Sequence, residues 1–327
     1  MFRYKIMTLG CKLNQYDSAR VAGKLGGERT LAAGGEPTDL AILNTCTVTH
    51  KADREARRLL RRFRRENPSA TIVVMGCSAR LRPGVYKNMP EVDVVLTTHQ
   101  TVDRFLEDWN AGEMGAGCRD AAHPALPYFA ERTRAFLKIQ EGCRLRCSYC
   151  IIPTVRGASR SIPVEDCLRS LEAFLEAGYK EIVLTGVNTG DYGLDLPARP
   201  RLESLLEKMV RIPGRFRIRL NSLEPKTITP GLVEMLAAEP KLSRHLQVPL
   251  QSGSDRVLET MRRNYRTARY REIVENLADK VPGIGIGADI LVGFPAETRE
   301  DFEETLAFVE NFPSANIGEF VQSLDMR

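Results

Sequence analysis

The sequence lacks long hydrophobic runs. Nowhere do eighteen or more apolar residues follow one another, and the N-terminal MFRYKIMTLGCKLNQ has no apolar core of the kind that signal peptides contain. These absences predict a cytoplasmic protein that has no membrane among its partners. The 327 residues, 43% hydrophobic and 27% charged, are enough for two globular domains.

Histidine is also scarce, with four residues in the chain. His50 and His99 are the two that fall in the first hundred residues, and a lone histidine near a strand end is more often structural than a ligand. The sequence shows no Ser-His-Asp or paired-carboxylate arrangement, so hydrolytic chemistry has no candidate site.

The cysteines are the most informative residues. In a reducing compartment eight cysteines are unlikely to form structural disulfides, so their spacing points to metal ligation or catalysis. Six of them form two triplets, which are Cys11, Cys46, Cys77 and Cys143, Cys147, Cys150. Cys118, in an expected linker, and Cys167, in an expected helix, are interpreted as bystanders.

The first hundred residues alternate short β-branched runs with helical patterns, which is typical of a parallel α/β sheet. The expected strands cover 4–9, 40–44, 71–75 and 92–97, and the expected helices cover 16–25, 52–66 and 101–109. Each cysteine of the first triplet follows one of the first three strands by two residues. Ligands of open parallel sheets bind at the carboxyl ends of strands, so these thiols are expected to converge.

A Gly-, Ala- and Pro-rich stretch without periodicity, residues 111–133, is interpreted as a linker between domains 1–110 and 134–327. A second series of strands follows it, over residues 135–139, 181–185, 216–220, 245–248, 284–292 and 316–321. Six βα units are too few for a closed eight-unit barrel. The predicted fold class is therefore α/β, with an N-terminal open parallel sheet domain followed by a partial (βα)6 barrel.

The second triplet has the spacing C-x3-C-x2-C and follows the first strand of this series. Three thiolates can bind three irons of a 4Fe-4S cluster and leave the fourth iron open for substrate chemistry. A structural zinc site needs four protein ligands, and the segment has no fourth Cys or nearby His. Zinc is therefore the weaker alternative.

This motif and its position resemble the radical S-adenosylmethionine (SAM) superfamily. The resemblance implies that the open iron chelates SAM, that an electron from the cluster cleaves the sulfonium, and that a 5′-deoxyadenosyl radical abstracts hydrogen. Cys143, Cys147 and Cys150 are then the catalytic cluster ligands. A low-potential electron donor such as a flavodoxin or ferredoxin is the implied partner.

Residues after the barrel strands are the candidates for SAM binding. The resemblance places Tyr149 and Gly293 near the adenine and the amino-group-binding segment at Thr185, Gly186, Val187 and Asn188. Polar residues after the third and fourth strands are placed at the ribose; they are Ser222, Glu224, Gln251 and Ser252. The alternatives are a plain βα turn and ordinary surface polarity.

Three further segments, TLGCKLNQYDS (8–18), NTCTVTHKADREAR (44–57) and MGCSAR (75–80), resemble the methylthiotransferases. In that family the N-terminal domain carries a second 4Fe-4S cluster on three cysteines, matched here by Cys11, Cys46 and Cys77, and the reaction replaces C–H with C–SCH3. The alternative is that these are small buried thiols at strand ends. It explains each cysteine singly but not all three together.

Lys12 and the run NTCTVTHKADR resemble the branch that methylthiolates N6-threonylcarbamoyladenosine (t6A) at position 37 of tRNA, beside the anticodon. The isopentenyladenosine branch has Gln-Met after its first cysteine and the ribosomal-protein branch has Pro-Lys; both remain alternatives. Outside the enzymes, the alternative is an iron-sulfur redox-sensing protein that binds RNA. Family members usually continue into a small β-rich RNA-binding domain, which this sequence is expected to lack.

One segment, 51–65, is strongly basic, with eight basic residues against two acidic ones. Its arginines recur at intervals of three and four residues and would share a helix face. Those expected to bind the tRNA anticodon stem-loop are Arg54, Arg57, Arg58, Arg61, Arg62 and Arg65. A solvated basic surface is the alternative.

Overall fold

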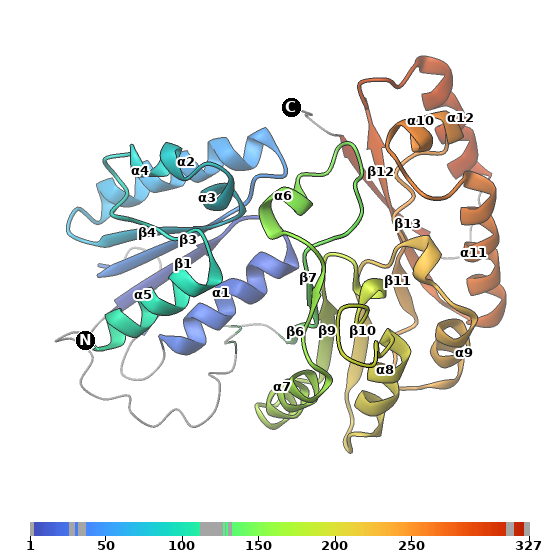
Figure 1. Ribbon diagram of the computed structural model, residues 1–327, viewed down its shortest axis with the longest axis horizontal. Coiled ribbons are helices and arrows are strands. Elements are labelled where there is room, and N and C mark those ends of the chain that lie inside the picture. Colours follow the sequence, from blue (N-terminus) through green and yellow to red (C-terminus); the bar gives the residue numbers. More distant parts are fainter. Residues whose placement is uncertain are drawn as a thin grey trace. The chain divides into compact units, whose positions relative to one another are not determined.

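The computed structural model describes residues 3–25, 30–31, 37–111, 127, 129, 133–311 and 317–323. Cys118 and most of the expected linker at 111–133 lie outside these residues. The chain divides into two compact units, Met1–Glu131 and Arg132–Arg327, which are described separately below (Figure 1).

The first unit is built on a parallel sheet. Its strands are β1 (Arg3–Thr8), β2 (Thr30–Leu31), β3 (Leu40–Thr45), β4 (Thr71–Gly76) and β5 (Val94–Val95), in the order β2-β1-β3-β4-β5, and each pairs in parallel with its neighbour. This confirms the predicted parallel α/β sheet. The short β2 was not predicted, and β5 is shorter than expected.

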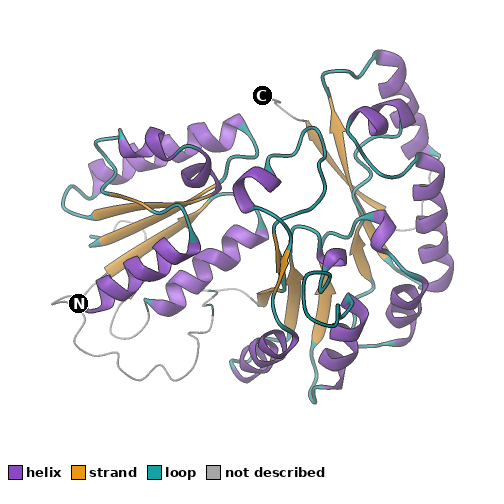
Figure 2. Cartoon of the chain, viewed as in Figure 1, coloured by secondary structure: helices purple, strands orange, loops and turns teal. Residues whose placement is uncertain are grey.

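Helices cover both faces of this sheet (Figures 1 and 2). One face carries α1 (Lys12–Lys24) and α5 (His99–Ala111); the other carries α2 (His50–Glu66), α3 (Cys77–Leu81) and α4 (Pro83–Lys87). Successive side chains of β3 alternate between the faces, so Leu40 and Ile42 pack with α1 and α5, whereas Ala41 and Leu43 pack with α2. The central strand β3 is therefore buried on both sides, as a doubly covered parallel sheet requires.

All three expected helices of this unit start earlier than predicted, α5 by two residues, at His99. α1 begins at Lys12 rather than at residue 16, and the extended Cys11 (φ −89°, ψ 177°) is its N-cap. Its start escaped prediction because its buried side includes polar residues, among them Asn14 and Asp17, instead of a continuous apolar stripe. α2 begins at His50 after Thr49, whose hydroxyl accepts a hydrogen bond from the N–H of Ala52 at 3.1 Å.

The second unit contains the six expected barrel strands. They are β6 (Arg134–Lys138), β9 (Glu181–Thr185), β10 (Arg217–Leu220), β11 (His245–Gln247), β12 (Gly285–Val292) and β13 (Ile317–Ser323). They form two parallel groups, β10-β9-β6 and β11-β12-β13. Ile218 of β10 joins the groups by donating to Lys241 O at 2.7 Å and accepting from Ser243 N at 2.8 Å. The partial barrel of the predicted fold class is thereby confirmed.

The helices between these strands cover the outer face of the barrel (Figure 2). They are α7 (Val164–Glu176), α8 (Leu202–Arg211), α9 (Pro230–Ala238), α10 (Asp255–Thr260), α11 (Thr267–Lys280) and α12 (Arg299–Glu310). A two-stranded antiparallel pair, β7 (Gln140–Glu141) with β8 (Arg160–Ser161), and the short α6 (Ile152–Arg156) were not predicted. Across the part of the chain that is described, no helix has both the length and the apolar character to span a membrane.

Candidate metal centres and SAM site

The loop that carries the second triplet begins directly after β7. Its first thiol, Cys143, is buried, while Cys147 and Cys150 are half-buried. The backbone closes on itself, because Cys143 N donates to Gly157 O at 3.1 Å and Cys150 N donates to Cys147 O at 3.1 Å. Gly142 has φ +74°, and a Cβ there would lie 2.1 Å from Ala158 O, so only glycine fits this turn.

The three sulfurs of this loop lie close enough to influence one another. Burial raises the pKa of the Cys143 thiol to about 11, and the neighbouring Cys150 and Cys147 also raise it. Burial likewise raises the pKa of Cys150, again with a contribution from Cys147. Metal binding deprotonates converging thiols of this kind because the cation stabilises their negative charge, so the donor set fits an iron cluster.

Gln140, which the sequence reasoning missed, joins this loop to the segment after β9. It is fully buried, and its Nε2 donates to Gly142 O at 2.7 Å and to Ser159 Oγ at 2.8 Å. Its Oε1 accepts from the N–H groups of Val187 at 2.8 Å and Asn188 at 3.1 Å. One carboxamide therefore sets the position of the predicted amino-group-binding segment relative to the cysteine loop.

The members of that segment have different surroundings. Thr185 is fully buried, and its carbonyl accepts from Ile139 N at 2.9 Å. A Cβ on Gly186 would lie 2.8 Å from Oε1 of Gln140, so a side chain there would displace the carboxamide. Asn188 is 3% exposed, and its Oδ1 has no hydrogen-bond partner among the residues that the structure describes. A buried acceptor of this kind suits a ligand that donates a hydrogen bond.

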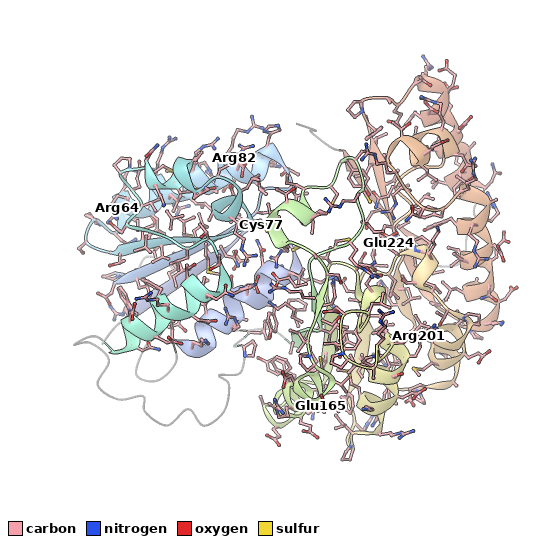
Figure 3. All side chains as sticks on the ribbon, viewed as in Figure 1. Arg64, Cys77, Arg82, Glu165, Arg201 and Glu224 are labelled. Carbon is pink, nitrogen blue, oxygen red and sulfur yellow. The ribbon has the colours of Figure 1, made fainter. Side chains whose placement is uncertain are left out.

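Glu224 lies within the second unit (Figure 3), and both of its carboxylate oxygens accept from Arg263 Nη2, at 2.8 and 2.7 Å. Arg263 Nη1 lies 3.3 Å from Cys147 Sγ. Burial raises the pKa of Glu224, and the adjacent guanidinium opposes this shift. The sequence did not predict a role for Arg263. Its guanidinium contacts both Glu224, the predicted ribose ligand, and Cys147, a predicted cluster ligand.

Tyr149 packs against an apolar cluster formed by Val257, Met261, Leu291 and Phe294. Gly293 directly precedes Phe294, has φ +78° and has open space where a Cβ would stand. Tyr149 therefore lies at an apolar surface that a flat heterocyclic ring could contact, and the exposed Gly293 adjoins this surface through Phe294.

The other predicted ribose ligands differ in accessibility. Ser222 is half-buried, and its carbonyl accepts from Thr189 Oγ1 at 2.9 Å. Gln251 is 8% exposed with φ +70°, and its backbone N–H donates a hydrogen bond to Asp289 O at 2.7 Å. Ser252 is fully buried, and its hydroxyl lies 3.1 Å from Thr305 Oγ1. Ser252 therefore ties its loop to α12.

The first triplet converges at the carboxyl ends of the first unit's strands. Cys11 caps α1 and is exposed, Cys46 directly follows β3, and Cys77 opens α3 (Figure 3). Gly10 has φ +98°, and a Cβ there would lie 2.8 Å from Cys46 Cβ and 2.9 Å from its Sγ. Burial raises the pKa of Cys46, and Cys77 and Cys11 raise it further, so these three sulfurs also lie together.

Asn14 links the ends of three strands beside these thiols. Its Nδ2 donates to Leu9 O at 2.7 Å and to Thr45 O at 3.0 Å, and Cys77 Sγ lies 3.8 Å from its Oδ1. A single buried carboxamide thus contacts the last residue of β3 and the residues that directly follow β1 and β4. The donor set here is again three converging thiols, two of them buried, and it fits a second iron cluster.

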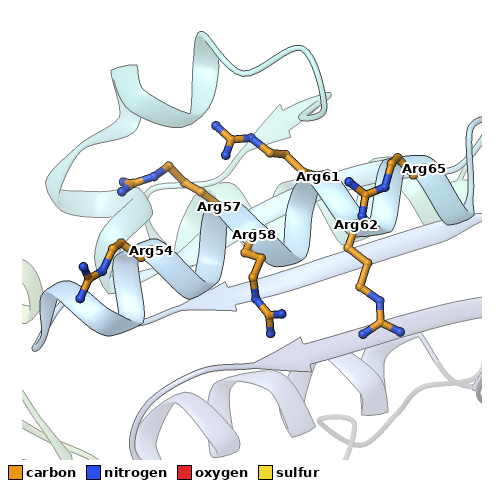
Figure 4. Close-up of a pocket in the computed structure, with 6 residues that line it drawn as sticks. All are labelled: Arg54, Arg57, Arg58, Arg61, Arg62 and Arg65. Carbon is orange, nitrogen blue, oxygen red and sulfur yellow. The ribbon is translucent and has the colours of Figure 1, made fainter.

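The basic helix α2 carries the six predicted RNA-binding arginines along a surface depression of about 310 Å³. Arg57 and Arg61 point to one side of the helix and Arg58 and Arg62 to the other (Figure 4). Arg58 pairs with Glu55 at 2.6 Å, Arg62 with Glu66 at 2.7 Å, and Arg61 with Glu91 at 3.9 Å. Within the described ranges, no carboxylate pairs with the remaining three, which are Arg54, Arg57 and Arg65.

Comparison with protein-family models gives one match for each unit. The model described as the radical SAM superfamily matches residues 137–309, and the model described as "Uncharacterized protein family UPF0004" matches residues 3–97. The first match covers the cysteine loop with C-x3-C-x2-C spacing and most of the barrel. The second covers all three cysteines of the first triplet.

Curated relatives span almost the whole chain. A threonylcarbamoyladenosine tRNA methylthiotransferase of Bacillus subtilis is 37% identical over 97% of this chain and 72% of its own length. A protein of the same name from Aquifex aeolicus is 35% identical over 94% of this chain and 77% of its own length. A tRNA-2-methylthio-N(6)-dimethylallyladenosine synthase of Carboxydothermus hydrogenoformans is 34% identical over 94% and 73%.

Solved structures show a similar fold. The radical SAM methyltransferase TsrM from Kitasatospora setae, solved with cobalamin and a [4Fe-4S] cluster bound, has a TM-score of 0.69 and 16% identity, covering 98% of this chain and 75% of its own. At this level of identity the similarity concerns the fold alone.

Proposed function

The chain belongs to the radical SAM superfamily and, within it, to the methylthiotransferase family, and on this basis we propose that it converts t6A in tRNA to the 2-methylthio derivative. The observation that carries the proposal is the presence of two separate sets of three converging thiols in one chain, each at the carboxyl end of a parallel sheet. A radical SAM reaction needs one set for its cluster. Insertion of a methylthio group also requires sulfur chemistry, which accounts for the other set of thiols in this proposal.

Membership of the superfamily implies SAM and a 4Fe-4S cluster. In our proposal Cys143, Cys147 and Cys150 hold that cluster, which supplies an electron to SAM when both are bound. The protein's part is to hold the ligand in place. Gln140 fixes the backbone of the 185–188 segment, the buried Oδ1 of Asn188 accepts a hydrogen bond from the SAM amino group, and Tyr149 contributes to an apolar surface for the adenine.

In the first unit, Cys11, Cys46 and Cys77 hold a second 4Fe-4S cluster in this proposal. Two supports come from the local structure. Gly10 leaves room beside Cys46 that any side chain would fill, and Asn14 contacts the segments from which all three cysteines extend. When bound, a cluster held by these cysteines would supply the sulfur chemistry that a radical SAM centre alone does not explain.

The t6A substrate is supported by relatives at 35–37% identity that are named for it. Sequence-specific RNA proteins read splayed loop bases, so in this proposal the adenosine to be modified enters the barrel of the second unit at the strand ends. The arginines of α2 bind tRNA phosphates. In this proposal the protein works in the cytoplasm and receives its electrons from a flavodoxin or ferredoxin. Relatives named for dimethylallyladenosine support that nucleoside as a second candidate substrate.

The proposal is tested by anaerobic reconstitution, quantitation of iron and sulfide, and incubation with reductant, SAM and tRNA. About eight irons per chain are expected from two cubic clusters. Nucleosides are then analysed by mass, using tRNA that contains t6A and, separately, tRNA that contains isopentenyladenosine. Methylthio-t6A formation supports the proposal. A methylthio product from the isopentenyladenosine tRNA alone would shift the substrate to the second candidate.

Three variants give this experiment its controls. Cys147→Ala is expected to abolish both 5′-deoxyadenosine and product, while Cys77→Ala is expected to abolish product and retain 5′-deoxyadenosine. Cys167→Ala is the matched control, because Cys167 is a fully buried thiol on α7 that belongs to neither set. About four irons in the unmodified chain would overturn the two-cluster part of the proposal.

A further inference from the structure

Arg263 lies in the interior of the second unit beside the cysteine loop. Its side chain is 3% exposed, and its guanidinium reaches two groups of opposite kind, the carboxylate of Glu224 and the sulfur of Cys147. A buried arginine is normally paired with a buried acid. Here one of its nitrogens is directed instead at a thiol that the proposed function assigns to iron.

The guanidinium is held rigidly in this position. Its Cζ lies 5.0 Å from the ring centroid of Tyr265, whose hydroxyl is 2.7 Å from Leu250 O and 2.9 Å from Pro249 O. The backbone N–H of Arg263 donates to Leu258 O at 2.8 Å. Tyr265 covers one face of the planar guanidinium, and Glu224 binds Nη2. Nη1 is therefore held in one direction, toward Cys147.

The segment that carries Arg263 is also attached to the cysteine loop through its backbone. Ser148 N donates to Met261 O at 3.1 Å, and Ser148 Oγ donates to Thr260 O at 2.9 Å. Both hydrogen bonds are donated by Ser148, the residue that follows Cys147. Three contacts therefore hold the turn after α10 against the middle of the C-x3-C-x2-C motif.

Hydrogen bonds and positive charge near a ligating sulfur stabilise the reduced form of an iron-sulfur cluster, because reduction adds one negative charge. A nearby carboxylate has the opposite effect. Arg263 and Glu224 thus act on the same cluster with opposite signs. Because the guanidinium and the carboxylate are paired, each partly cancels the effect of the other's charge on the cluster.

We propose that Arg263 is a positioning residue that raises the reduction potential of the cluster on Cys143, Cys147 and Cys150 through an N–H···S hydrogen bond to Cys147, and that Glu224 lowers it. This inference rests on the proposed function. It adds a determinant of how readily the cluster accepts the electron that it passes to SAM.

The test is a potentiometric titration followed by electron paramagnetic resonance, without SAM, in a Cys11→Ala/Cys46→Ala/Cys77→Ala background that leaves one cluster. At a fixed applied potential, Arg263→Gln is expected to lower the ratio of reduced to oxidised cluster about tenfold, which corresponds to about 59 mV for one electron. Arg263→Lys keeps the positive charge but lacks the planar guanidinium. Its reduction potential should therefore lie between those of the parent protein and Arg263→Gln. Glu224→Gln should raise the potential.

The double variant Arg263→Gln/Glu224→Gln leaves no unpaired buried charge and keeps the test available if Arg263→Gln folds poorly. Its potential should lie below that of Glu224→Gln alone. Arg219→Gln is the matched control, because Arg219 also pairs with a partly buried glutamate, Glu181, at 2.8 Å, and no contact joins it to the cysteine loop within the described ranges. It should leave the potential unchanged.

The outcomes separate the two proposals. If the parent protein assembles a cluster but its potential is the same in Arg263→Gln, or if Arg263→Gln and Glu224→Gln shift it in the same direction, the role of Arg263 is overturned and the proposed function stands. If the parent holds no cluster on the remaining cysteines, the proposed function fails and this inference fails with it.

Discussion

The side-chain oxygen of Gln140 accepts a hydrogen bond from the backbone N–H of Val187 at 2.8 Å. The two residues are 47 positions apart, and the bond joins the strand that leads into the cysteine loop to the turn after β9. The same oxygen accepts from Asn188, while the amide nitrogen donates back to the loop at Gly142. The cluster loop and the proposed SAM-binding segment are therefore one hydrogen-bonded assembly.

Replacement of this carboxamide should weaken SAM binding. Gln140→Leu keeps the approximate volume but leaves several buried backbone groups without partners, so we expect a loss of about 2 kcal/mol or more in stability. SAM affinity should fall about tenfold or more because the 185–188 segment is no longer fixed. Equilibrium binding of SAM and thermal unfolding measure the two effects. Gln100→Leu, at an exposed position on α5, is the control and should change neither.

Gly10 should be required only for the cluster proposed on Cys11, Cys46 and Cys77. Gly10→Ala forces a side chain onto a residue with φ +98° and brings its Cβ to 2.8 Å from Cys46 Cβ. We expect iron to fall from about eight to about four per chain, with 5′-deoxyadenosine formation retained. Gly84→Ala, on α4 with no atom within 4 Å of the added Cβ, is the matched control. Full iron content in Gly10→Ala would contradict the role of Gly10 in keeping Cys46 accessible to a cluster.

The sequence is sufficient to identify both cysteine triplets and the α/β class, because these depend on local spacing and on period-two and helical patterns. It does not identify Arg263, which contacts a cysteine 116 residues away, or Gln140, whose role depends on a turn after another strand. The start of α1 was misplaced for a related reason. Its first turn buries Asn14 against strand ends that only the folded sheet brings together.

The arginines of α2 should not contribute equally to tRNA binding. Arg58 and Arg62 already pair with glutamates of the same helix, whereas Arg54, Arg57 and Arg65 pair with no carboxylate of the described residues. Replacing the latter three by glutamine should therefore weaken binding more than Arg58→Gln/Arg62→Gln. If each of the three binds one phosphate, the slope of log affinity against log salt should fall by about 0.7 per arginine.

This is measured by filter binding over a salt series, with iron content as the check that both clusters are intact. Reversal of Arg57, Arg58, Arg61 and Arg62 to glutamate should weaken tRNA binding and reduce its salt dependence. Unchanged binding in the reversed protein would reject α2 as the docking surface and leave these arginines as a solvated basic helix.

Asp301 should make the second unit sensitive to acid. It is 4% exposed at the start of α12, where the Arg256 guanidinium, the Thr298 N–H and the Ser254 hydroxyl hold its pKa below the usual aspartate value, although burial opposes them. A lowered pKa gives stability that is complete above the unfolded value of about 3.9 and is lost as the pH falls below it. Asp301→Asn should therefore cost about 1–3 kcal/mol at neutral pH.

The difference between the two proteins should stay constant from neutral pH to about pH 5 and shrink in more acidic solution. Thermal unfolding midpoints over this range measure it. Asp279→Asn, at an exposed position on α11 where no described residue pairs with the carboxylate, should match the unsubstituted protein at every pH. A difference that grew on acidification would contradict the assigned direction of the Asp301 shift.

Replacement of Asn188 should weaken SAM binding without the loss of stability expected for Gln140→Leu. Its buried Oδ1 has no partner among the described residues, so Asn188→Ala removes a polar atom whose burial is unfavourable in the unliganded chain. We expect the thermal unfolding midpoint without SAM to stay the same or rise, and SAM affinity to fall about tenfold because the amino group loses its acceptor. Gln140→Leu loses both stability and affinity. A stability loss in Asn188→Ala with unchanged SAM binding would mean that Asn188 has a structural role and that the amino group is held elsewhere.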